Sequence, residues 1–283
     1  MSRNSRSAKS AGPSPTKTKR PGAPPVVLTI AGSDNSCGAG AQADLKTITA
    51  FGAYAQTAIT CVVAEVPGRV SAVQPIRPAI VAEQIRLSFQ AFPVAAVKTG
   101  MLYSTSIIRA VAFALRECAP RIPLVIDPVM VASSGDPLLR PGAIAAYRKL
   151  LFPLATLITP NLDELRILSG MPCRNLDEIQ NAGAHLVEKY GCAFLLKGGH
   201  LKTSVATDIL ATRDGMQIFT APFRKAAETH GTGCTLSAAI AAGLAHGHPL
   251  PHAVAEAKRH ITRAIAQSHH WSSTSALNHS PLD

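Results

Sequence analysis

A glycine-rich run near residue 230 carries the clearest chemical signal in this 283-residue chain. Residues 229–235 read Thr-His-Gly-Thr-Gly-Cys-Thr, and the small residues that follow predict a helix. Two glycines at a helix N-terminus leave successive N–H groups free to meet one anion, and the helix dipole strengthens that attraction. We expect Cys234 at this terminus to have a thiol pKa below the reference of about 8.5. A glycine turn capping an alanine-rich helix is the alternative, but such a turn needs only one glycine.

Polar residues also follow three short apolar runs that predict buried strands. Asp127 closes one of them, where a carboxylate is costly unless it is paired or binds a cation. Asn161 and Glu164 follow the next with i, i+3 spacing, so they share a face and can hold Mg²⁺ and its waters. An N-cap with a capping-box glutamate is the alternative for these two residues. Lys197 follows a third run and adds a fixed cation, so the set indicates phosphoryl transfer from a nucleotide.

A second glycine-rich loop, residues 32–40, lies between the first apolar run and a helical pattern. Such a loop leaves backbone N–H groups free to approach a ligand closely. It is not a Walker loop, because no Gly-Lys-Ser/Thr follows. Asp44 lies one turn into the helix, on the side that could face the loop. A glycine-rich turn with a capping aspartate is the alternative.

These residues need a scaffold, and the apolar pattern predicts one. Strands are expected at residues 26–31, 58–63, 94–97, 124–126, 157–158, 193–196, 205–211 and 217–220. Helices are expected at residues 41–50, 79–90, 105–116, 141–151, 162–168, 176–189, 234–245 and 252–267. Strands that alternate with helices form a mostly parallel sheet with helices on both faces. Asp214-Gly215 marks a tight turn, which predicts a hairpin at one edge of the sheet.

The net charge of +11 is concentrated at the N-terminus. Residues 1–25 hold six basic residues, no acidic residue and many Ser and Pro, which predicts a disordered basic tail. Residues 26–267 form one expected domain, and residues 268–283 are expected to be a flexible C-terminal tail. The remaining +5 and only 5% aromatic residues make a nucleic-acid partner an unfavoured interpretation. No run of about 18 apolar residues predicts a membrane span.

Scattered cysteines and two histidines complete the chemical inventory. The six cysteines form no CxxC pair, so we expect reduced thiols in a cytoplasmic protein. His248 and His252 have helical metal-ligand spacing. Because Pro249 and Pro251 lie between them, a polar loop is the favoured interpretation.

Seven motifs, in order, resemble one family. They are Ala-Gly-Ser-Asp at 31–34, Gln-Ala-Asp-Leu-Lys at 42–46, Val-Lys-Thr-Gly-Met-Leu at 97–102, Asp-Pro-Val-Met at 127–130, Ile-Thr-Pro-Asn at 158–161, Lys-Gly-Gly-His at 197–200 and His-Gly-Thr-Gly-Cys-Thr at 230–235. The chain resembles the hydroxymethylpyrimidine and phosphomethylpyrimidine kinases of thiamine biosynthesis, of the ribokinase-like superfamily. The resemblance implies a three-layer α/β sandwich and phosphorylation of 4-amino-5-hydroxymethyl-2-methylpyrimidine, then of its monophosphate. It also implies ATP and Mg²⁺ as cofactors and a homodimer.

The resemblance also implies residue roles. Gly231, Gly233 and Cys234 match the anion hole and the proton acceptor, and Lys197 matches the phosphate-contacting cation. Asp127 and Glu164 match the metal residues. The implied nucleotide-binding residues are Asn161, Lys197, Thr229 and Thr232, and the implied pyrimidine-binding residues are Gly32, Ser33, Ala39, Asp44, Glu65, Met101 and Val129.

Glu65 departs from the family pattern. The family reads Thr-Ala-Gln-Asn-Thr after its second strand, whereas residues 63–67 here read Val-Ala-Glu-Val-Pro. Glutamine both donates and accepts hydrogen bonds, but ionised glutamate only accepts. Either Glu65 pairs with a protonated aminopyrimidine, or the substrate is another pyrimidine or a pyridine, as in a vitamin-B6 kinase. A harmless exchange at the rim of the pocket is a third interpretation.

A non-catalytic pyrimidine sensor that binds nucleic acid through its tail is an alternative from another class. The presence of Lys197, Asp127, Glu164 and Cys234 together speaks against it, because a sensor would not need all four.

Overall fold

The computed structural model describes residues 22–130, 139–140, 142–198, 205–223 and 230–282. Within these ranges nine strands form one sheet in the order β3-β2-β1-β4-β5-β6-β7-β8-β9. The strands are β1 (Val26–Asp34), β2 (Tyr54–Val66), β3 (Arg69–Pro75), β4 (Val94–Thr99), β5 (Leu124–Ile126), β6 (Leu157–Ile158), β7 (Ala193–Lys197), β8 (Val205–Thr212) and β9 (Gly215–Pro222). The six strands from β2 to β7 in this order are parallel, as the sequence predicts.

Antiparallel strands flank the parallel core at both edges. The predicted hairpin around Asp214-Gly215 is confirmed, since β8 pairs with β9 and β9 is the edge strand. At the other edge β3 pairs with β2 across a turn at Gly68, which has φ +81°. The apolar pattern does not predict β3, because most of its residues are exposed and no buried alternation marks it.

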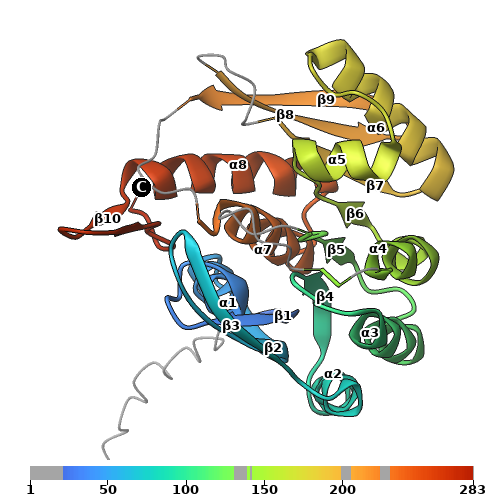
Figure 1. Ribbon diagram of the computed structural model, residues 1–283, viewed down its shortest axis with the longest axis vertical. Coiled ribbons are helices and arrows are strands. Elements are labelled where there is room, and N and C mark those ends of the chain that lie inside the picture. The colour runs from blue at the N-terminus through green and yellow to red at the C-terminus, as the bar shows by residue number, and fades with distance from the viewer. Residues whose placement is uncertain (1–21, 131–138, 141, 199–204, 224–229, 283) are drawn as a thin grey trace, which may run out of the picture.

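Helices cover both faces of the sheet (Figure 1). The helices α1 (Gly40–Ala50), α7 (Thr232–Ala245) and α8 (Leu250–Ala266) pack on one face. The helices α2 (Pro78–Ala91), α3 (Thr105–Cys118), α4 (Ala143–Ala146), α5 (Leu162–Ser169) and α6 (Leu176–Tyr190) pack on the other. Every predicted helix is present among the described residues, although the helix expected at 141–151 is found as α4 followed by a π-helical turn at Tyr147–Leu151.

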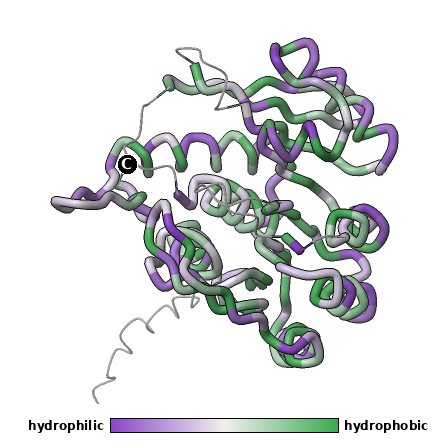
Figure 2. Tube along the Cα trace, viewed as in Figure 1, coloured by the Kyte–Doolittle hydropathy of each residue, from purple (hydrophilic) through white to green (hydrophobic). Residues whose placement is uncertain are grey.

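Alternate strand residues supply the two cores. Leu28 and Ile30 of β1 point into the core under α3, whereas Val27 between them points into the core under α7. Both faces of a strand are buried in this way only when helices cover both sides of the sheet. Figure 2 shows hydrophobic colour along the central strands and hydrophilic colour in many turns and outer helix positions.

Helix α7 packs between α1 and α8 on one face of the sheet, and every residue from Thr235 to Gly243 is buried. An added Cβ at Gly243 would lie 2.9 Å from the Cβ of Ala253 in α8. Small residues therefore let α7 pack closely against the neighbouring helix, and they fix the position of its N-terminus at the edge of the sheet.

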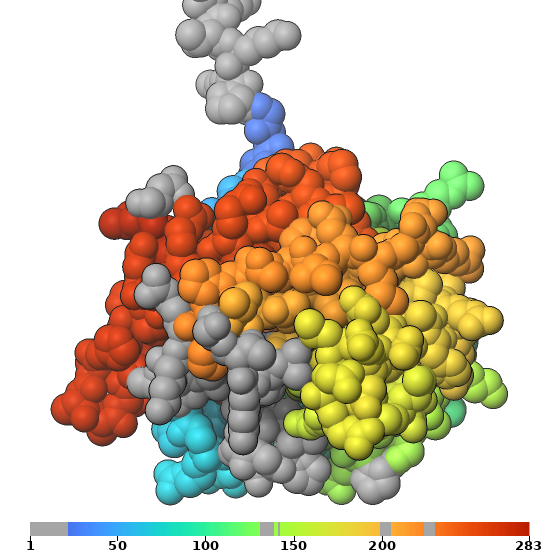
Figure 3. Space-filling model, turned by 90° about the horizontal axis from the view of Figure 1, so that it is seen from above, coloured from blue at the N-terminus to red at the C-terminus, as the bar shows by residue number. Residues whose placement is uncertain are grey.

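The C-terminal segment differs from the expected flexible tail. Residues His269–His270 (β10) pair with Ser275–Ala276 (β11), and the side chains of Leu277 and His279 are buried. Leu277 joins the core beneath α7 and α8, so an apolar anchor orders a polar stretch. Figure 3 shows α8 beside the β8–β9 hairpin on the outer surface. Most of the expected N-terminal tail lies outside the described residues.

Among the described residues, no helix combines the length and the apolar character that crossing a membrane requires.

Candidate active site

The carboxyl ends of the parallel strands place polar residues at one edge of the sheet. Asp34 ends β1, Asp127 follows β5, Thr159 follows β6 and Lys197 ends β7. The strand order reverses between β1 and β4, and open α/β sheets bind ligands at such a point. The N-terminus of α7 reaches the same edge, since Gly233 lies beside Lys197 and Asp127. The structure therefore brings the segments that the sequence analysis grouped into one site.

Two glycines allow the close approach at the start of α7. Gly231 is the N-cap with φ +83°, and an added Cβ would lie 1.8 Å from the carbonyl oxygen of Gly38. An added Cβ at Gly233 would lie 3.1 Å from Lys197 Nζ and 3.4 Å from Asp127 Oδ2. A side chain at Gly231 would push the two loops apart, and one at Gly233 would crowd the ion pair. The N–H groups at a helix N-terminus point out of the helix and can bind an anion.

Lys197 and Asp127 form an ion pair above this helix start. Lys197 Nζ lies 2.9 Å from Asp127 Oδ1, and Thr159 donates a hydrogen bond of 3.2 Å to the same oxygen. Ser237 of α7 donates to Asp127 Oδ2 over 3.4 Å. Burial favours the neutral amine, but the carboxylates of Asp127 and Glu164 outweigh burial and raise the pKa of Lys197. The side chain of Lys197 keeps 15% of its surface exposed, so its ammonium can meet a ligand.

Asn161 and Glu164 form the capping box of α5. Asn161 Oδ1 accepts from the N–H groups of Asp163 and Glu164, and Glu164 Oε2 accepts from Asn161 N at 2.9 Å. Glu164 Oε1 also accepts from Met130 N at 3.2 Å. The capping alternative is therefore realised in the structure. Burial raises the pKa of Glu164 to about 7 despite Lys197, and Asp127 adds to the rise.

The thiol of Cys234 does not have the lowered pKa that we expected. Burial raises its pKa to about 11, and the carboxylates of Asp44 and Asp127 act in the same direction. Lys98 and a hydrogen bond from the Gly40 backbone lower it, but by less. The expectation considered the helix dipole alone, whereas loss of water is the larger effect here. Cys234 is consequently a protonated thiol at neutral pH.

Asp44 is a second correction. Its side chain is completely buried in an ion pair with Lys98, whose Nζ lies 2.8 and 2.7 Å from the two carboxylate oxygens. Thr29 donates a third hydrogen bond of 2.6 Å. Burial opposes the charge on Lys98, but the carboxylate outweighs it and raises the Lys98 pKa. Asp44 therefore does not cap α1, whose N-cap is Ala39, and its carboxylate is engaged by Lys98 and Thr29.

Sequence reasoning assigned no role to Lys98. A lysine inside the apolar strand run 94–99 is itself a signal, because such a residue needs a buried partner.

The loop after β1 is built around Asp34. Its carboxylate accepts from Ser36 N at 2.7 Å, Ser36 Oγ at 2.9 Å and Ala39 N at 2.8 Å. His230 Nε2 lies 3.0 Å from Asp34 Oδ2, which joins this loop to the start of α7. Burial acts to raise the pKa of Asp34, but the hydrogen bonds from His230, Ser36 and Ala39 prevail and lower it to about 2. The sequence analysis used His230 in a motif but gave it no role.

Glu65 lies next to Asp34 and His230. Ligand atoms of Asp34, Glu65 and His230 are all within 4.8 Å of one another. The Glu65 backbone N–H donates to Asn35 Oδ1 at 2.7 Å, which holds the end of β2 against the loop. Burial and the charge of Asp34 raise the pKa of Glu65, and His230 lowers it. Glu65, the residue that departs from the family pattern, thus lies close to a second carboxylate, that of Asp34.

The other predicted pyrimidine-contacting residues lie along the same edge. Gly32 packs on Cys61 and Met101, whose sulfur atoms are 3.9 Å apart, and an added Cβ would lie 3.5 Å from Met101 Sδ. Ser33 Oγ accepts from Gln42 Nε2 at 2.8 Å. Ala39 and Val129 are partly buried.

The predicted nucleotide-binding residues include two threonines. Thr232 is the first residue of α7, whereas Thr229 lies outside the described residues.

Asp127 and Glu164 are the groups that fit a Mg²⁺ ion. Both are carboxylates that act on Lys197, and neither belongs to a cluster of three or more potential ligands among the described residues. Magnesium is commonly held by one or two carboxylates together with waters and substrate phosphates. This donor set therefore suits an ion that arrives with a nucleotide.

Comparison with known proteins agrees with this arrangement. A crystal structure of Bacillus subtilis pyridoxal kinase with ADP superposes with a TM-score of 0.84 at 36% identity, over 92% of this chain and 98% of that one. The phosphomethylpyrimidine kinase of Clostridium difficile superposes with a TM-score of 0.76 at 39% identity, over 85% and 99% of the two chains. The fold is that of the ribokinase-like kinases.

Sequence relatives narrow the class to one family. The family model described as phosphomethylpyrimidine kinase matches residues 34–279. A hydroxymethylpyrimidine/phosphomethylpyrimidine kinase of Rhizobium meliloti is 44% identical over 85% of this chain and 90% of its own. A thiamine biosynthesis bifunctional protein of Geobacter sulfurreducens is 44% identical over 84% of this chain, which spans 49% of that protein. The chain belongs to the phosphomethylpyrimidine kinase family.

Proposed function

We propose that this protein transfers the γ-phosphoryl group of ATP to 4-amino-5-hydroxymethyl-2-methylpyrimidine and then to its monophosphate, in thiamine biosynthesis. The observation that carries the proposal is the Lys197–Asp127 ion pair above the glycine-lined start of α7. The names of the relatives support the choice of substrate. The structure of a relative with ADP supports a nucleotide as donor.

The phosphate end of the site works by positioning and electrostatics. The N–H groups at the start of α7 hold the transferring phosphoryl, and Lys197 contacts its oxygens. Asn161 and Thr232 lie along the nucleotide side. Asp127 and Glu164 would hold a Mg²⁺ ion with its waters, and the ion would neutralise charge on the phosphates.

Cys234 lies where the substrate hydroxyl would approach the phosphoryl group. Its pKa of about 11 keeps it protonated in the free enzyme, so it is a weak base at neutral pH. Phosphoryl transfer passes through a loose transition state in most analyses, in which the hydroxyl loses its proton late. Cys234 therefore orients the hydroxyl, and the hydroxyl proton passes to an oxygen of the transferred phosphoryl group once the new P–O bond has largely formed.

The pyrimidine end is defined by Glu65, with Met101 and Val129 beside the ring. Because the pKa of Glu65 is raised, its carboxyl can share one proton with a ring nitrogen while accepting from the exocyclic amine. This arrangement replaces the donor and acceptor pair of a glutamine. Asp34 and His230 hold the loop that closes this end.

Pyridoxal is the second candidate substrate. Glu65 alters the group that meets the ring, and pyridoxal kinases are among the close structural matches. A rate comparison decides between them. The purified protein is incubated with ATP and Mg²⁺ and with the hydroxymethylpyrimidine, its monophosphate or pyridoxal, and product masses are measured.

We expect one and then two phosphates on the pyrimidine, and a lower kcat/KM for pyridoxal. Turnover of pyridoxal alone would overturn the substrate assignment. Absence of any ATP-dependent product would overturn the kinase proposal. The Lys197→Met variant serves as the inactive control.

We also propose that the enzyme is a cytoplasmic homodimer. Sedimentation equilibrium of the purified chain tests the dimer, which a single species of 29.6 kDa would contradict.

A further inference from the structure

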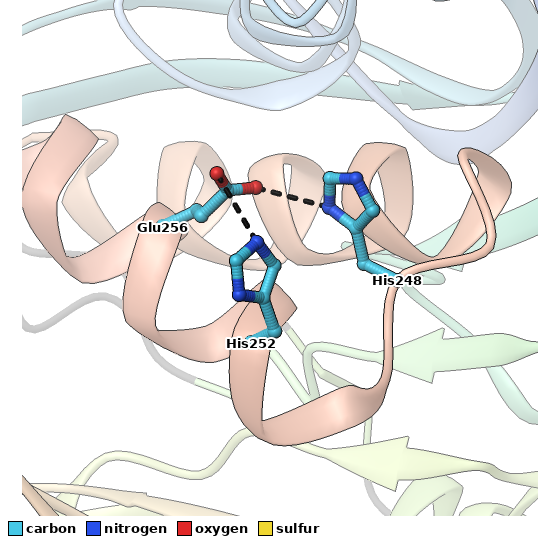
Figure 4. A group of neighbouring side chains, drawn as sticks. All are labelled: His248, His252 and Glu256. Atoms are coloured by element: carbon cyan, nitrogen blue, oxygen red, sulfur yellow. Dashed lines mark ion pairs between the residues drawn. The ribbon is translucent and has the colours of Figure 1, made fainter.

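A second cluster of polar side chains lies at the turn between α7 and α8 (Figure 4). His248 precedes α8, and His252 and Glu256 lie on its first two turns. His248 Nδ1 is 3.0 Å from Glu256 Oε2, and His252 Nε2 is 3.4 Å from Glu256 Oε1. Figure 4 shows both imidazoles directed at the one carboxylate.

The local sequence explains this convergence, which we did not expect. The favoured interpretation placed both histidines in a polar loop because of Pro249 and Pro251. Helix α8 begins at Leu250, however, and Pro251 occupies its first turn, where a missing N–H breaks no helical hydrogen bond. His252 and Glu256 are then one turn apart on one face of the helix, and Pro249 turns His248 back towards them.

The separations match a metal site. With metal–ligand distances of about 2.1 Å and tetrahedral angles, neighbouring ligand atoms lie about 3.4 Å apart. The three ligand atoms here all lie within 4.8 Å of one another, and the two histidine–carboxylate distances are 3.0 and 3.4 Å. Small side-chain rotations are enough to place one ion between them.

The His248 nitrogen gives an independent indication. Nδ1 of His248 is buried, and its 3.0 Å contact with Glu256 Oε2 lacks hydrogen-bond geometry, so this nitrogen makes no hydrogen bond within the described part of the chain. A buried polar atom without a hydrogen bond costs free energy, and a bound cation would satisfy this one. It lies beside a cavity of about 370 Å³, which Glu256, His246 and Arg259 also line.

Neighbouring groups leave the coordinating atoms available. Arg259 Nη2 lies 3.6 Å from Glu256 Oε1, a long and exposed contact that water can replace. His246 is engaged elsewhere, because its Nε2 lies 2.9 Å from the carbonyl oxygen of Phe51. The donor set is therefore two imidazoles and one carboxylate, with the remaining position open to water.

We propose that His248, His252 and Glu256 form a binding site for a divalent transition-metal ion of the zinc class. Imidazole nitrogens suit Zn²⁺, Ni²⁺ and Cu²⁺, whereas Mg²⁺ prefers oxygen ligands. The ion would tie the α7–α8 turn to the second turn of α8. Helix α7 has 14 residues, so this site lies about 20 Å from the start of α7. The site is therefore structural, and it does not depend on the proposed kinase activity.

Zinc titration of the full-length protein tests the proposal. Protein stripped with a chelator is titrated with ZnCl₂ by calorimetry and with CoCl₂ by visible absorption, which is intense for tetrahedral Co²⁺. The variants are His252→Ala and Glu256→Gln. His185→Ala, which removes an exposed histidine of α6, and Glu65→Gln, which alters the cluster of Asp34 and His230, are the matched controls.

We expect one equivalent of Zn²⁺ to bind to the wild type and to both controls, and to raise the Tm. Since even partners of metal ligands are worth about 10–100-fold in affinity, loss of a ligand should weaken binding by at least that factor. Equal zinc affinity in His252→Ala, Glu256→Gln and wild type would overturn the site. Loss of the ion only in Glu65→Gln would assign it to the other cluster and would equally refute the proposal. Circular dichroism of each variant shows that it folds.

Discussion

Two lysine–aspartate pairs lie near the start of α7, and they differ in their access to solvent. Both side chains of the Lys98–Asp44 pair are 0% exposed, whereas 15% of the Lys197 side chain is exposed in its pair with Asp127. Asp44 has all its partners within the protein, but Lys197 can exchange part of its interaction with Asp127 for a phosphate. Residues with the same chemistry therefore have different roles, the first pair supporting the site and the second binding in it.

The largest expected effect is on stability, through the fully buried Lys98–Asp44 pair. Lys98→Met leaves the Asp44 carboxylate buried without its cation, which typically costs about 3–5 kcal/mol. Urea unfolding should show this loss, and the double variant Lys98→Met/Asp44→Leu should recover much of it because no charge remains. If Lys98→Met is as stable as the wild type, the pair is not the support that we describe.

The partly exposed Lys197–Asp127 pair should behave in the opposite way. Lys197→Met should lower kcat/KM for the pyrimidine by about 10²–10³-fold, since it removes a donor to the transferring phosphoryl, with little change in unfolding free energy. Lys258→Met is the comparison variant, because Lys258 of α8 pairs over 2.6 Å with Asp208, which lies opposite Lys197 on the neighbouring strand β8. That variant should lose stability and keep the kcat of its folded fraction. Similar kcat losses in Lys197→Met and Lys258→Met would contradict the distinction between a pair that binds in the site and a pair that supports the fold.

Cys234 lies between the two pairs, and the titration of its thiol reports the combined electrostatic field of their charges. With a pKa of about 11, its alkylation by iodoacetamide at pH 8 should be more than about 100-fold slower than that of a free thiol, and should accelerate steadily up to pH 11. Mass spectrometry of the peptide that contains Cys234 measures the rate. Rapid alkylation at a rate that is already independent of pH at pH 7 would show that Cys234 is a thiolate and would contradict this prediction.

The smallest effect is expected at Glu65, farther from both pairs. Below its raised pKa the carboxyl carries the proton that it shares with the pyrimidine, and as the pH rises through that pKa the proton is lost. The KM of the wild type should therefore rise with pH, by up to about tenfold. The KM of Glu65→Gln should stay flat, because an amide does not titrate. Parallel pH profiles of the two enzymes would argue for a harmless exchange.

The sequence predicted the scaffold well because the relevant information is local. Short apolar runs at 94–97 and 193–196 mark strands that are buried on both faces, and Asp214-Gly215 marks a hairpin. The polar residues at the ends of these runs lie at one edge because parallel strands place their carboxyl ends together. The exposed strand β3 has no such signal and is found only through its pairing.

The errors concern effects that depend on packing. Asp44 faces Lys98 rather than the loop because of how α1 sits on the sheet, and spacing alone does not show this. The pKa of Cys234 depends on burial, which a motif does not reveal. Leu277 anchors the C-terminal segment in the core, and hydrogen bonds between Leu282 and Gln267 add to this distant contact.

The hydrogen bond between His230 and Asp34 joins residues that are 196 positions apart. During synthesis the chain emerges from its N-terminus at about 5–20 residues per second, so the loop after β1 waits on the order of ten seconds or more for its partner. Until α7 is synthesised, one face of the nascent sheet lacks the helix that packs on it in the folded protein, so Val27, Val125 and Leu195 are exposed there. A ribosome-bound chain that stops before residue 230 is therefore a natural target for chaperones that bind apolar strands, and phosphate binding should begin only as the last two helices are released.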